Sequence, residues 1–241
     1  MLSIVIPALN EEKYLPLLLE SIKRQDFKDC EIILADAGSK DKTIEIAQKY
    51  NCVIVSGGLP AKGRNEGAKI AKGELLFFCD ADVVLPDNFF EKALAEFNGR
   101  NLDIASFCLS PIPKSIISSF FINLFYNYPI ILLEKFLPHA AMGIFIKKEL
   151  FKKIGGFDET VKLAEDHYLA RMAVKLFQAK FGIIKSVKIY VSDRRFKTDG
   201  WIHTGIKFFL CELYMVFLGP VRSDIFKYKF GHHEKKDETK V

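Results

Sequence analysis

The sequence predicts an α/β fold: a mostly parallel, doubly wound sheet with helices on both faces and helical additions near the C-terminus. Short β-branched or apolar segments alternate with segments of helical periodicity through the first hundred residues, which is typical of β-α-β units. The apolar run that begins at Leu75 is typical of a strand buried on both faces. With 241 residues and 49% hydrophobic side chains, the chain can form one large domain with a full core.

The first predicted strand, residues 2–7, ends at Pro7 and leads into a helix. Asn10 is the expected N-cap of that helix, because acidic residues follow it in the first turn. Its buried face is expected to carry Tyr14, Leu17, Leu18 and Ile22.

Two more strands follow in the same half. Residues 31–35 form the second, which closes on Asp36, and Ser39 or Asp41 is expected to cap the helix that runs to residue 50. Residues 52–56 form the third. Glycines and basic residues at 57–65 predict a flexible loop around Arg64, before a helix at 65–72.

Two carboxylates, Asp80 and Asp82, follow the apolar central strand. Alternate side chains of an extended chain point the same way, so both would face one side at the carboxyl end of the strand. Ligands bind at that edge of open α/β sheets, and two close carboxylates suit a hard divalent cation. A solvated acidic turn explains the same tripeptide equally well.

The second half contains a strand at 101–109 and then 19 uncharged residues at 115–133. This stretch is long enough to cross a membrane. However, polar residues recur on one face and predict an amphipathic helix instead: Ser115, Ser119, Asn123 and Asn127. The apolar face either packs within the fold or lies at a membrane surface. The same alternatives hold for the apolar helix at 205–218, which is too short to span.

Charged residues near the C-terminus also have two interpretations each. Glu165 and Asp166 begin a helix at 166–177, where carboxylates are ordinary helix-start residues as well as candidate site residues. After a strand at 183–191, Arg194 and Arg195 fit either a phosphate contact or a solvated turn. His203 is a surface histidine or a further metal ligand. The polar tail, residues 231–241, is expected to be disordered.

The net charge of +5 lies entirely in residues 185–241, which carry 12 basic and 7 acidic side chains. Such a segment suits anionic partners, either diphosphates or lipid headgroups. No nucleic-acid-binding motif accompanies the charge, so we expect no nucleic acid partner.

The five cysteines are scattered, odd in number and without Cys-x-x-Cys spacing. They predict reduced thiols in a cytoplasmic protein, with neither a disulfide framework nor a cysteine zinc site. The chain enters its first strand directly, so we expect no signal peptide.

Four motifs together resemble family 2 glycosyltransferases of the GT-A fold, which include the dolichol-phosphate sugar synthases. They are Ser-Ile-Val-Ile-Pro-Ala-Leu-Asn-Glu-Glu at 3–12, Asp-Ala-Gly-Ser-Lys-Asp-Lys-Thr at 36–43, Gly-Arg-Asn-Glu-Gly at 63–67 and Asp-Ala-Asp at 80–82. One departure is Ala35, where many members carry a second aspartate.

The resemblance implies roles for named residues. Mn²⁺ or Mg²⁺ would bind Asp82, supported by Asp80, and Asp166, beside Glu165, would be the general base. The nucleotide-sugar would contact the following residues: Pro7, Ala8, Asn10, Glu11, Asp36, Arg64, Arg194 and Arg195. Residues 1–220 would form the GT-A domain, with a nucleotide-sugar half at 1–100 and an acceptor half at 101–220. Residues 221–241 would be a basic segment and polar tail.

The predicted activity is metal-dependent, inverting transfer of a sugar from a nucleotide-diphosphate sugar to a glycan or a polyprenyl phosphate, with peripheral contact at the cytoplasmic face of an anionic membrane. A nucleotidyltransferase that makes nucleotide-sugars is one alternative, although it should carry a glycine-rich basic loop after the first strand. A non-catalytic sugar- or lipid-binding protein of the same fold is the other.

Overall fold

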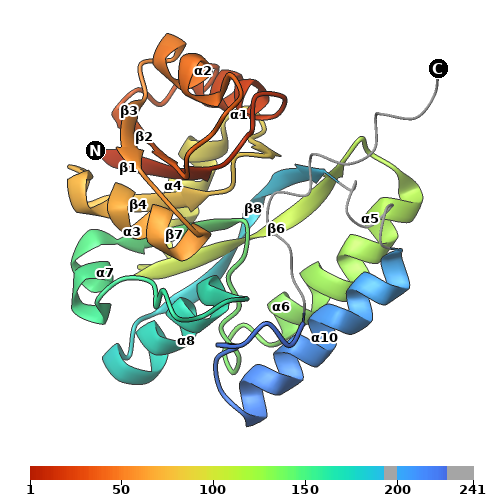
Figure 1. Cartoon of the computed structure of the whole chain (residues 1–241). Helices are drawn as coiled ribbons and strands as arrows, with labels where there is room; N and C mark the ends of the chain where they lie inside the picture. Colours follow the sequence, from red (N-terminus) through yellow and green to blue (C-terminus); the bar gives the residue numbers. More distant parts are fainter. Residues whose placement is uncertain (193–199, 227–241) are drawn as a thin grey trace, which may run out of the picture.

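The structure, a computed structural model, describes residues 1–192 and 200–226 (Figure 1). Its described strands form one sheet in the order β3-β2-β1-β4-β7-β6-β8-β5. The pairings make all of them run in one direction except β5 and β7. The predicted mostly parallel α/β fold is confirmed. The strands are β1 (Leu2–Ala8), β2 (Cys30–Asp36), β3 (Val53–Ser56), β4 (Leu75–Cys79), β5 (Val83–Val84), β6 (Ile104–Ile112), β7 (Gly143–Lys147) and β8 (Phe181–Ser192).

Helices cover both faces of the sheet. Side chains alternate along each strand, so neighbouring residues of one strand belong to two different cores. Ile4 and Ile6 of β1 belong to a core shared with α1, α2 and α4, whereas Val5 belongs to one shared with α3, α7 and α8. The helices are α1 (Leu15–Lys23), α2 (Thr43–Lys49), α3 (Pro60–Ile70), α4 (Phe89–Gly99), α5 (Ile116–Ile122), the π-helical η1 (Asn123–Asn127), α6 (Tyr128–Leu132), α7 (Lys148–Ile154), α8 (Glu165–Phe177) and α10 (Trp201–Phe217).

Strand β4 is buried on both sides, as the apolar run predicts. Phe77 packs edge-on against Phe107 and Phe145 in one core. Phe78 faces the other core and contacts Phe157 with ring centroids 5.0 Å apart. This central strand therefore anchors both layers of helices, and its carboxyl end is held firmly in place.

The sheet curls so that its edge returns to its centre. Strand β5 begins three residues after Asp80, yet it pairs with β8 at the far end of the strand order. The intervening Asp80-Ala81-Asp82 turn consequently lies where β4, β5 and β8 come together.

The first helix differs from its prediction. Helix α1 begins at Leu15 and has Pro16 in its first turn, where the missing N–H of proline is tolerated. Asn10 does not cap it, because it lies five residues before Leu15, with a left-handed φ of 55°. Leu17, predicted to be buried, is 55% exposed. The N-cap of α2 is Lys42, which makes no side-chain cap hydrogen bond, so neither Ser39 nor Asp41 holds that position. Asp41, one residue earlier, does accept the Thr43 N–H at 3.0 Å.

The predicted flexible loop at 57–65 is also wrong, because α3 already begins at Pro60. Its glycines serve close packing. A Cβ added to Gly67 would lie 2.3 Å from Cγ1 of Val5, so only glycine lets the helix lie this close to β1. Arg64 therefore projects from a helix packed tightly on the sheet.

The predicted helix at 115–133 is made of α5, η1 and α6, and its two faces have an unusual placement. The polar face points inward: Asn127 is 2% exposed, accepts the Leu109 N–H and donates to the Leu109 carbonyl. The apolar face is exposed, with Ile117 at 65%, Leu124 at 46% and Tyr128 at 64%. Burial of this face within the fold is thus excluded.

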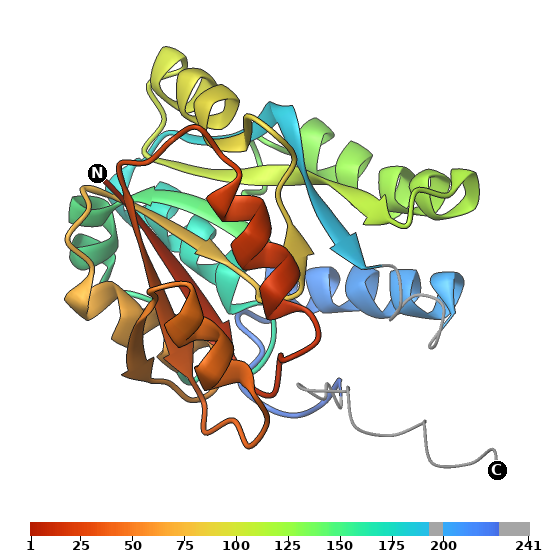
Figure 2. The same cartoon turned by 90° about the horizontal axis from the view of Figure 1, so that it is seen from above.

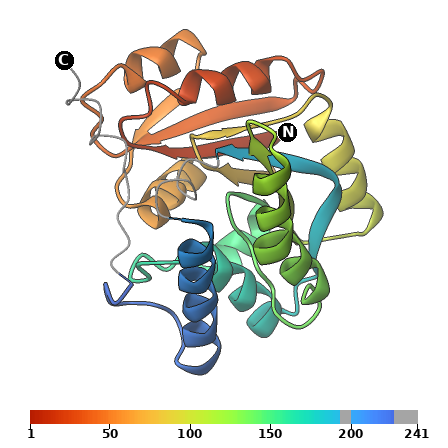
Figure 3. The ribbon, with the colours of Figure 1, turned by 90° about the vertical axis from the view of Figure 1, so that its right-hand side faces the viewer.

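Helix α10 lies beside this segment. A Cβ on Gly205 would be 3.2 Å from the ring of Phe125, so this ring lies against the backbone of α10. Figures 2 and 3 show α5–α6 (green) and α10 (blue) side by side, extending away from the N-terminal half. Within the described residues, no helix has both the length and the hydropathy to cross a membrane.

Candidate active site

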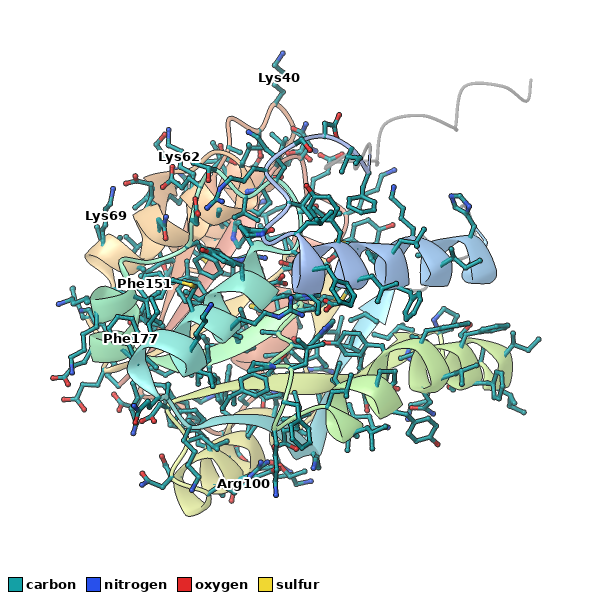
Figure 4. The ribbon with its side chains drawn as sticks, turned by 90° about the horizontal axis from the view of Figure 1, so that it is seen from below. Lys40, Lys62, Lys69, Arg100, Phe151 and Phe177 are labelled. Carbon is teal, nitrogen blue, oxygen red and sulfur yellow. The ribbon has the colours of Figure 1, made fainter. Side chains whose placement is uncertain are left out.

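The loops after β1 and β2 are joined at the carboxyl edge of the sheet. The Asn10 N–H donates to Oγ of Ser39, and Asn10 Oδ1 accepts the Lys40 N–H at 2.8 Å. Glu11 N–H donates to Oγ1 of Thr43 at 2.7 Å. Four predicted substrate-binding residues lie in or next to this pair of loops: Pro7, Ala8, Asn10 and Glu11. Lys40 projects outward from its tip (Figure 4).

Asp36 ends β2 inside these loops and is 8% exposed. Its Oδ2 accepts the N–H groups of Gly38 and Ser39 at 2.9 and 3.0 Å. Its Oδ1 is buried and has no hydrogen-bond partner among the described residues. A buried acceptor in this state is suited to a donor group on a ligand.

Arg64 joins the two halves of the chain. It is 5% exposed, donates to Oδ1 of Asp80 at 2.7 Å and donates to Oε1 of Glu165 at 2.6 Å. Burial opposes its charge, but Asp80, Glu165 and Asp166 together raise the pKa of Arg64 above its ordinary value. The guanidinium therefore stays charged and connects the end of β4 to the start of α8.

Asp166 lies in the first turn of α8, next to this ion pair. Its side chain is 14% exposed, and its Oδ1 accepts the N–H of His167 at 2.9 Å. Burial, then the charge of Glu165, raises the pKa of Asp166 to about 7, although Arg64 opposes the shift. A carboxyl group with this pKa can accept and release a proton near neutral pH.

Asp80 and Asp82 provide oxygen ligands at the same edge. Arg64 occupies Oδ1 of Asp80, whose side chain remains 34% exposed. Asp82 lies between the buried residues Ala81 and Val83 in the turn after β4. Two carboxylates with solvent access are the donor set that Mg²⁺ and Mn²⁺ prefer, so these residues fit such an ion.

A second cluster, which the sequence interpretation missed, adjoins Asp166. His139, from the loop before β7, lies against His167, with ring centroids 3.7 Å apart and the two rings tilted by 41°. Both histidines contact Glu212 of α10. The three are separated by 28 and 45 positions in the chain, so no spacing connects them. The one available signal is Glu212 itself, the single carboxylate in the sequence of a largely apolar helix.

Three residues named from the sequence remain: Arg194, Arg195 and His203. Arg194 and Arg195 lie outside the described residues. His203 is described and lies exposed in the first turn of α10.

Comparisons with known proteins identify the class. The model of glycosyl transferase family 2 matches residues 3–138, which is more than half of the chain. The minor teichoic acid biosynthesis protein GgaB of Bacillus subtilis is 31% identical over 215 residues, covering 82% of this chain and 23% of GgaB. The chain belongs to glycosyl transferase family 2, and it has the GT-A fold.

Solved structures agree on the fold. TarS 1–349 of S. aureus in complex with UDP-GlcNAc has a TM-score of 0.61 and 25% identity, covering 79% of this chain and 58% of TarS 1–349. The mannosyltransferase PcManGT of Pyrobaculum calidifontis, in complex with GDP-Man and Mn²⁺, has a TM-score of 0.65 and 20% identity, covering 78% of this chain and 56% of PcManGT. The chain therefore spans less than two thirds of each of these proteins.

Proposed function

We propose that this glycosyltransferase moves a sugar, with inversion, from a nucleotide-diphosphate sugar to a lipid-linked or glycan acceptor at the cytoplasmic face of a membrane. The observation that carries the proposal is Arg64, which ties the Asp80 end of β4 to Glu165 beside Asp166. Arg64 thereby brings together two kinds of group. Asp80 offers oxygen ligands for a cation bound to the diphosphate, and Asp166 is a carboxyl group of raised pKa.

Residues 1–100 would hold the donor. The unpartnered Oδ1 of Asp36 favours an N–H donor on the nucleoside base. The end of β1 and the joined loops, with Pro7, Ala8, Asn10 and Glu11, would surround the nucleoside. Binding of UDP-GlcNAc by TarS and GDP-Man by PcManGT supports a nucleotide-sugar donor without fixing which one.

Asp82, with Asp80, would hold the divalent cation. When bound, Mn²⁺ or Mg²⁺ neutralises charge on the diphosphate and makes the nucleoside diphosphate a better leaving group. Arg64 would add positive charge beside the diphosphate, and so would Arg194 and Arg195 from outside the described residues. The Mn²⁺ in PcManGT supports this class of ion.

Residues 101–220 would hold the acceptor, with Asp166 as its nearest carboxyl group. For a hydroxyl acceptor, Asp166 would take the proton as the oxygen attacks the anomeric carbon from the face opposite the leaving group. A polyprenyl phosphate is already an anion, so Asp166 would position it instead.

The exposed apolar helices favour a lipid-linked acceptor. Helix α10 places Glu212 against His167, the residue after Asp166, while Phe209 and Phe217 on the same helix are 62% and 78% exposed. Ile116 and Phe136, at the two ends of the neighbouring segment, are 91% and 83% exposed. Apolar surface of this extent beside a polar site suits a membrane surface with the acceptor headgroup at the site.

Donor and metal are tested together. We expect UDP-, GDP- or dTDP-sugars to raise the melting temperature of the chain in the presence of Mn²⁺, because a ligand that binds only the native state stabilises it. EDTA should abolish transfer, and Asp82→Asn should lose transfer while keeping its fold by circular dichroism. Full transfer by Asp82→Asn in EDTA would contradict the metal assignment. Pyrophosphate release from a nucleoside triphosphate and a sugar phosphate would indicate nucleotidyl transfer instead.

A further inference from the structure

Two histidines and a glutamate from three separate elements converge behind Asp166. Nδ1 of His167 lies 2.5 Å from Oε1 of Glu212, and Nδ1 of His139 lies 3.3 Å from the same oxygen. One ligand atom from each residue lies within 4.8 Å of the other two. We propose that His139, His167 and Glu212 form a site for a zinc-class divalent cation, separate from the cation at Asp82.

The donor atoms are of the right kind. Two imidazole nitrogens and one carboxylate oxygen are the three protein ligands of many zinc sites, with bonds of about 2.0–2.2 Å. The ion would take the place of the hydrogen bond between His167 and Glu212, and the ligand atoms would move apart slightly to admit it. Imidazole-rich sites favour Zn²⁺ and its neighbours in the first transition row, whereas the two carboxylates at Asp82 favour Mg²⁺ and Mn²⁺.

Neighbouring side chains fix the ligands in place. Arg171 donates to the second oxygen of Glu212, which leaves Oε1 directed at the histidines. Its positive charge opposes a cation, but the carboxylate of Asp166 lies on the other side of His167, with Oδ1 3.8 Å from Nε2. Tyr126 packs edge-on against the ring of His139. Outer contacts of this kind are usual around metal-binding histidines and carboxylates.

The site has access to solvent. The side chains of His139, His167 and Glu212 are 16%, 13% and 20% exposed. Water can therefore supply the fourth ligand of a tetrahedral ion. A cation bound to Nδ1 of His167 would also place the proton of that ring on Nε2, the nitrogen that faces Asp166.

The site has a structural consequence, because its ligands come from the loop before β7, from α8 and from α10. Apolar contacts of Cys211 and Met215 with Leu163 and Val221 also hold α10. A cation at Glu212 would add a polar anchor that fixes α10 against the acceptor half.

Direct metal binding tests the proposal, with Co²⁺ as a spectroscopic probe and Zn²⁺ as the competing ion. The full chain should carry His232→Ala and His233→Ala, because adjacent histidines in the sequence also bind transition metals. We expect one equivalent of Co²⁺ with visible absorption bands of a four- or five-coordinate ion, displaced by Zn²⁺. The same single equivalent should bind to Asp82→Asn, which separates this site from the one proposed for Mn²⁺.

Ligand variants sharpen the test. His167→Gln and Glu212→Gln, made in the same background, should each weaken Co²⁺ binding by at least about tenfold. His203→Gln, an exposed histidine on the same helix, is the matched control and should leave the Co²⁺ spectrum unchanged. If circular dichroism shows that a variant is misfolded, the X-ray absorption spectrum of the Zn²⁺-loaded parent chain is measured instead. That spectrum should show two imidazole ligands. Absence of a stoichiometric ion, or a spectrum unchanged in both ligand variants, would overturn the proposal and leave a hydrogen-bonded ionic cluster. Loss of transfer activity alone bears only on the proposed function.

Discussion

Two neighbouring regions of the molecule depart from the usual placement of side chains. One region buries charged groups, and the other exposes apolar groups. At the carboxyl edge of the sheet, charged groups are buried: Arg64 is 5% exposed and Glu165 is 7% exposed. Over the α5–α6 segment and α10, large apolar groups are exposed instead, including Phe120 at 59% and Phe217 at 78%. Buried charges and exposed apolar patches are the two departures from ordinary packing that most often mark function.

The difference shows how the two regions are stabilised. The charged edge depends on complementary partners, since a buried charge without one is strongly unfavourable. The helical pair keeps its polar side chains inward, as Asn127 does through its bonds to Leu109, and leaves apolar area for another surface to cover. Glu212 connects the regions, because it reaches Asp166's neighbour His167 from the helix that also carries Phe217. Each prediction below alters one region and leaves the other in place.

The largest expected effect is on transfer by Asp166→Asn. General-base assistance contributes roughly 10²–10⁴ in rate, so transfer to a hydroxyl acceptor should fall by about that factor. Transfer to a lipid phosphate should fall much less, because that nucleophile needs no deprotonation. Initial rates with each acceptor at saturating donor measure the difference. Donor affinity from isothermal titration is the control, and its loss would place Asp166 on the donor side instead.

The ion pair at the charged edge should be worth more than an exposed one. Arg64→Met leaves Asp80, Glu165 and Asp166 close together without their cation, which should destabilise the fold by about 3–5 kcal/mol. Arg222→Met is the matched control, because Arg222 pairs with Asp158 at 2.7 Å but is 52% exposed. That change should cost about 0–1 kcal/mol. Urea unfolding of both variants measures the contrast, and equal costs would show that burial does not set the strength of these pairs.

Stability should depend on pH through Asp166. Its folded-state pKa is raised from 3.8 to about 7, so its contribution to stability is present below about pH 4 and is lost as the pH rises through 7. Asp166→Asn should therefore gain roughly 2–4 kcal/mol relative to the parent between pH 4 and pH 8. Urea unfolding at several pH values measures this gain.

Asp158→Asn provides the opposite case. Burial opposes the shift, but hydrogen bonds from Thr160 and Arg222 lower the folded-state pKa of Asp158. Its stabilising contribution is present above its unfolded pKa and is lost as the pH falls, so the variant should lose stability relative to the parent at neutral pH. For each variant, the difference in unfolding free energy from the parent is plotted against pH. The same slope for Asp166→Asn and Asp158→Asn would contradict the assigned pKa directions.

Sequence patterns predicted the elements of secondary structure that depend on neighbouring residues in the chain. Strands β1, β2 and β4 and helix α8 lie within about two residues of their expected bounds, because apolar runs and helix-start signals are local. Asp36 and Asp80 each stand at the end of a strand that pairs in parallel with β1, and such strands end at one edge of the sheet. The contact between Arg64 and Glu165, 101 positions apart, required the folded chain.

Errors arose where packing overrides composition. The glycines at 57, 58 and 63, together with basic residues, predicted a flexible loop, but α3 begins at Pro60, and Gly63 and Gly67 let it lie against β1. The amphipathic pattern at 115–133 was recognised, whereas the direction of its apolar face was left open. Neither the exposed apolar surface nor the cluster of His139, His167 and Glu212 could be predicted, because both depend on where α10 docks.

The apolar region should bind membranes in proportion to its exposed side chains. We expect the parent chain to sediment with anionic phospholipid vesicles, and the double variant Phe120→Ser, Phe217→Ser to bind roughly tenfold or more weakly, because each aromatic ring buries apolar area. Leu17→Ser with Leu59→Ser is the matched control, since both residues are exposed, at 55% and 51%, but lie in the nucleotide-sugar half. Vesicle binding that is absent in the parent, or equal in both double variants, would exclude these helices as a membrane-binding surface.

The smallest expected effect comes from changing glycine to alanine at two helical positions, Gly67 in α3 and Gly205 in α10. Gly67→Ala places a methyl group 2.3 Å from the buried Val5, so the sheet or α3 must shift, and the cost should be about 1–3 kcal/mol. Gly205→Ala meets the ring of Phe125 at 3.2 Å, but that ring is 44% exposed and can move by a few tenths of an ångström. Alanine also favours a helix over glycine by about 1 kcal/mol, so this variant should be neutral or slightly more stable. Urea unfolding of the two variants gives the difference directly. A large loss in Gly205→Ala would mean that α10 and η1 are packed as rigidly as the sheet, and that their apolar faces belong to a fixed unit rather than to two independently adjustable helices.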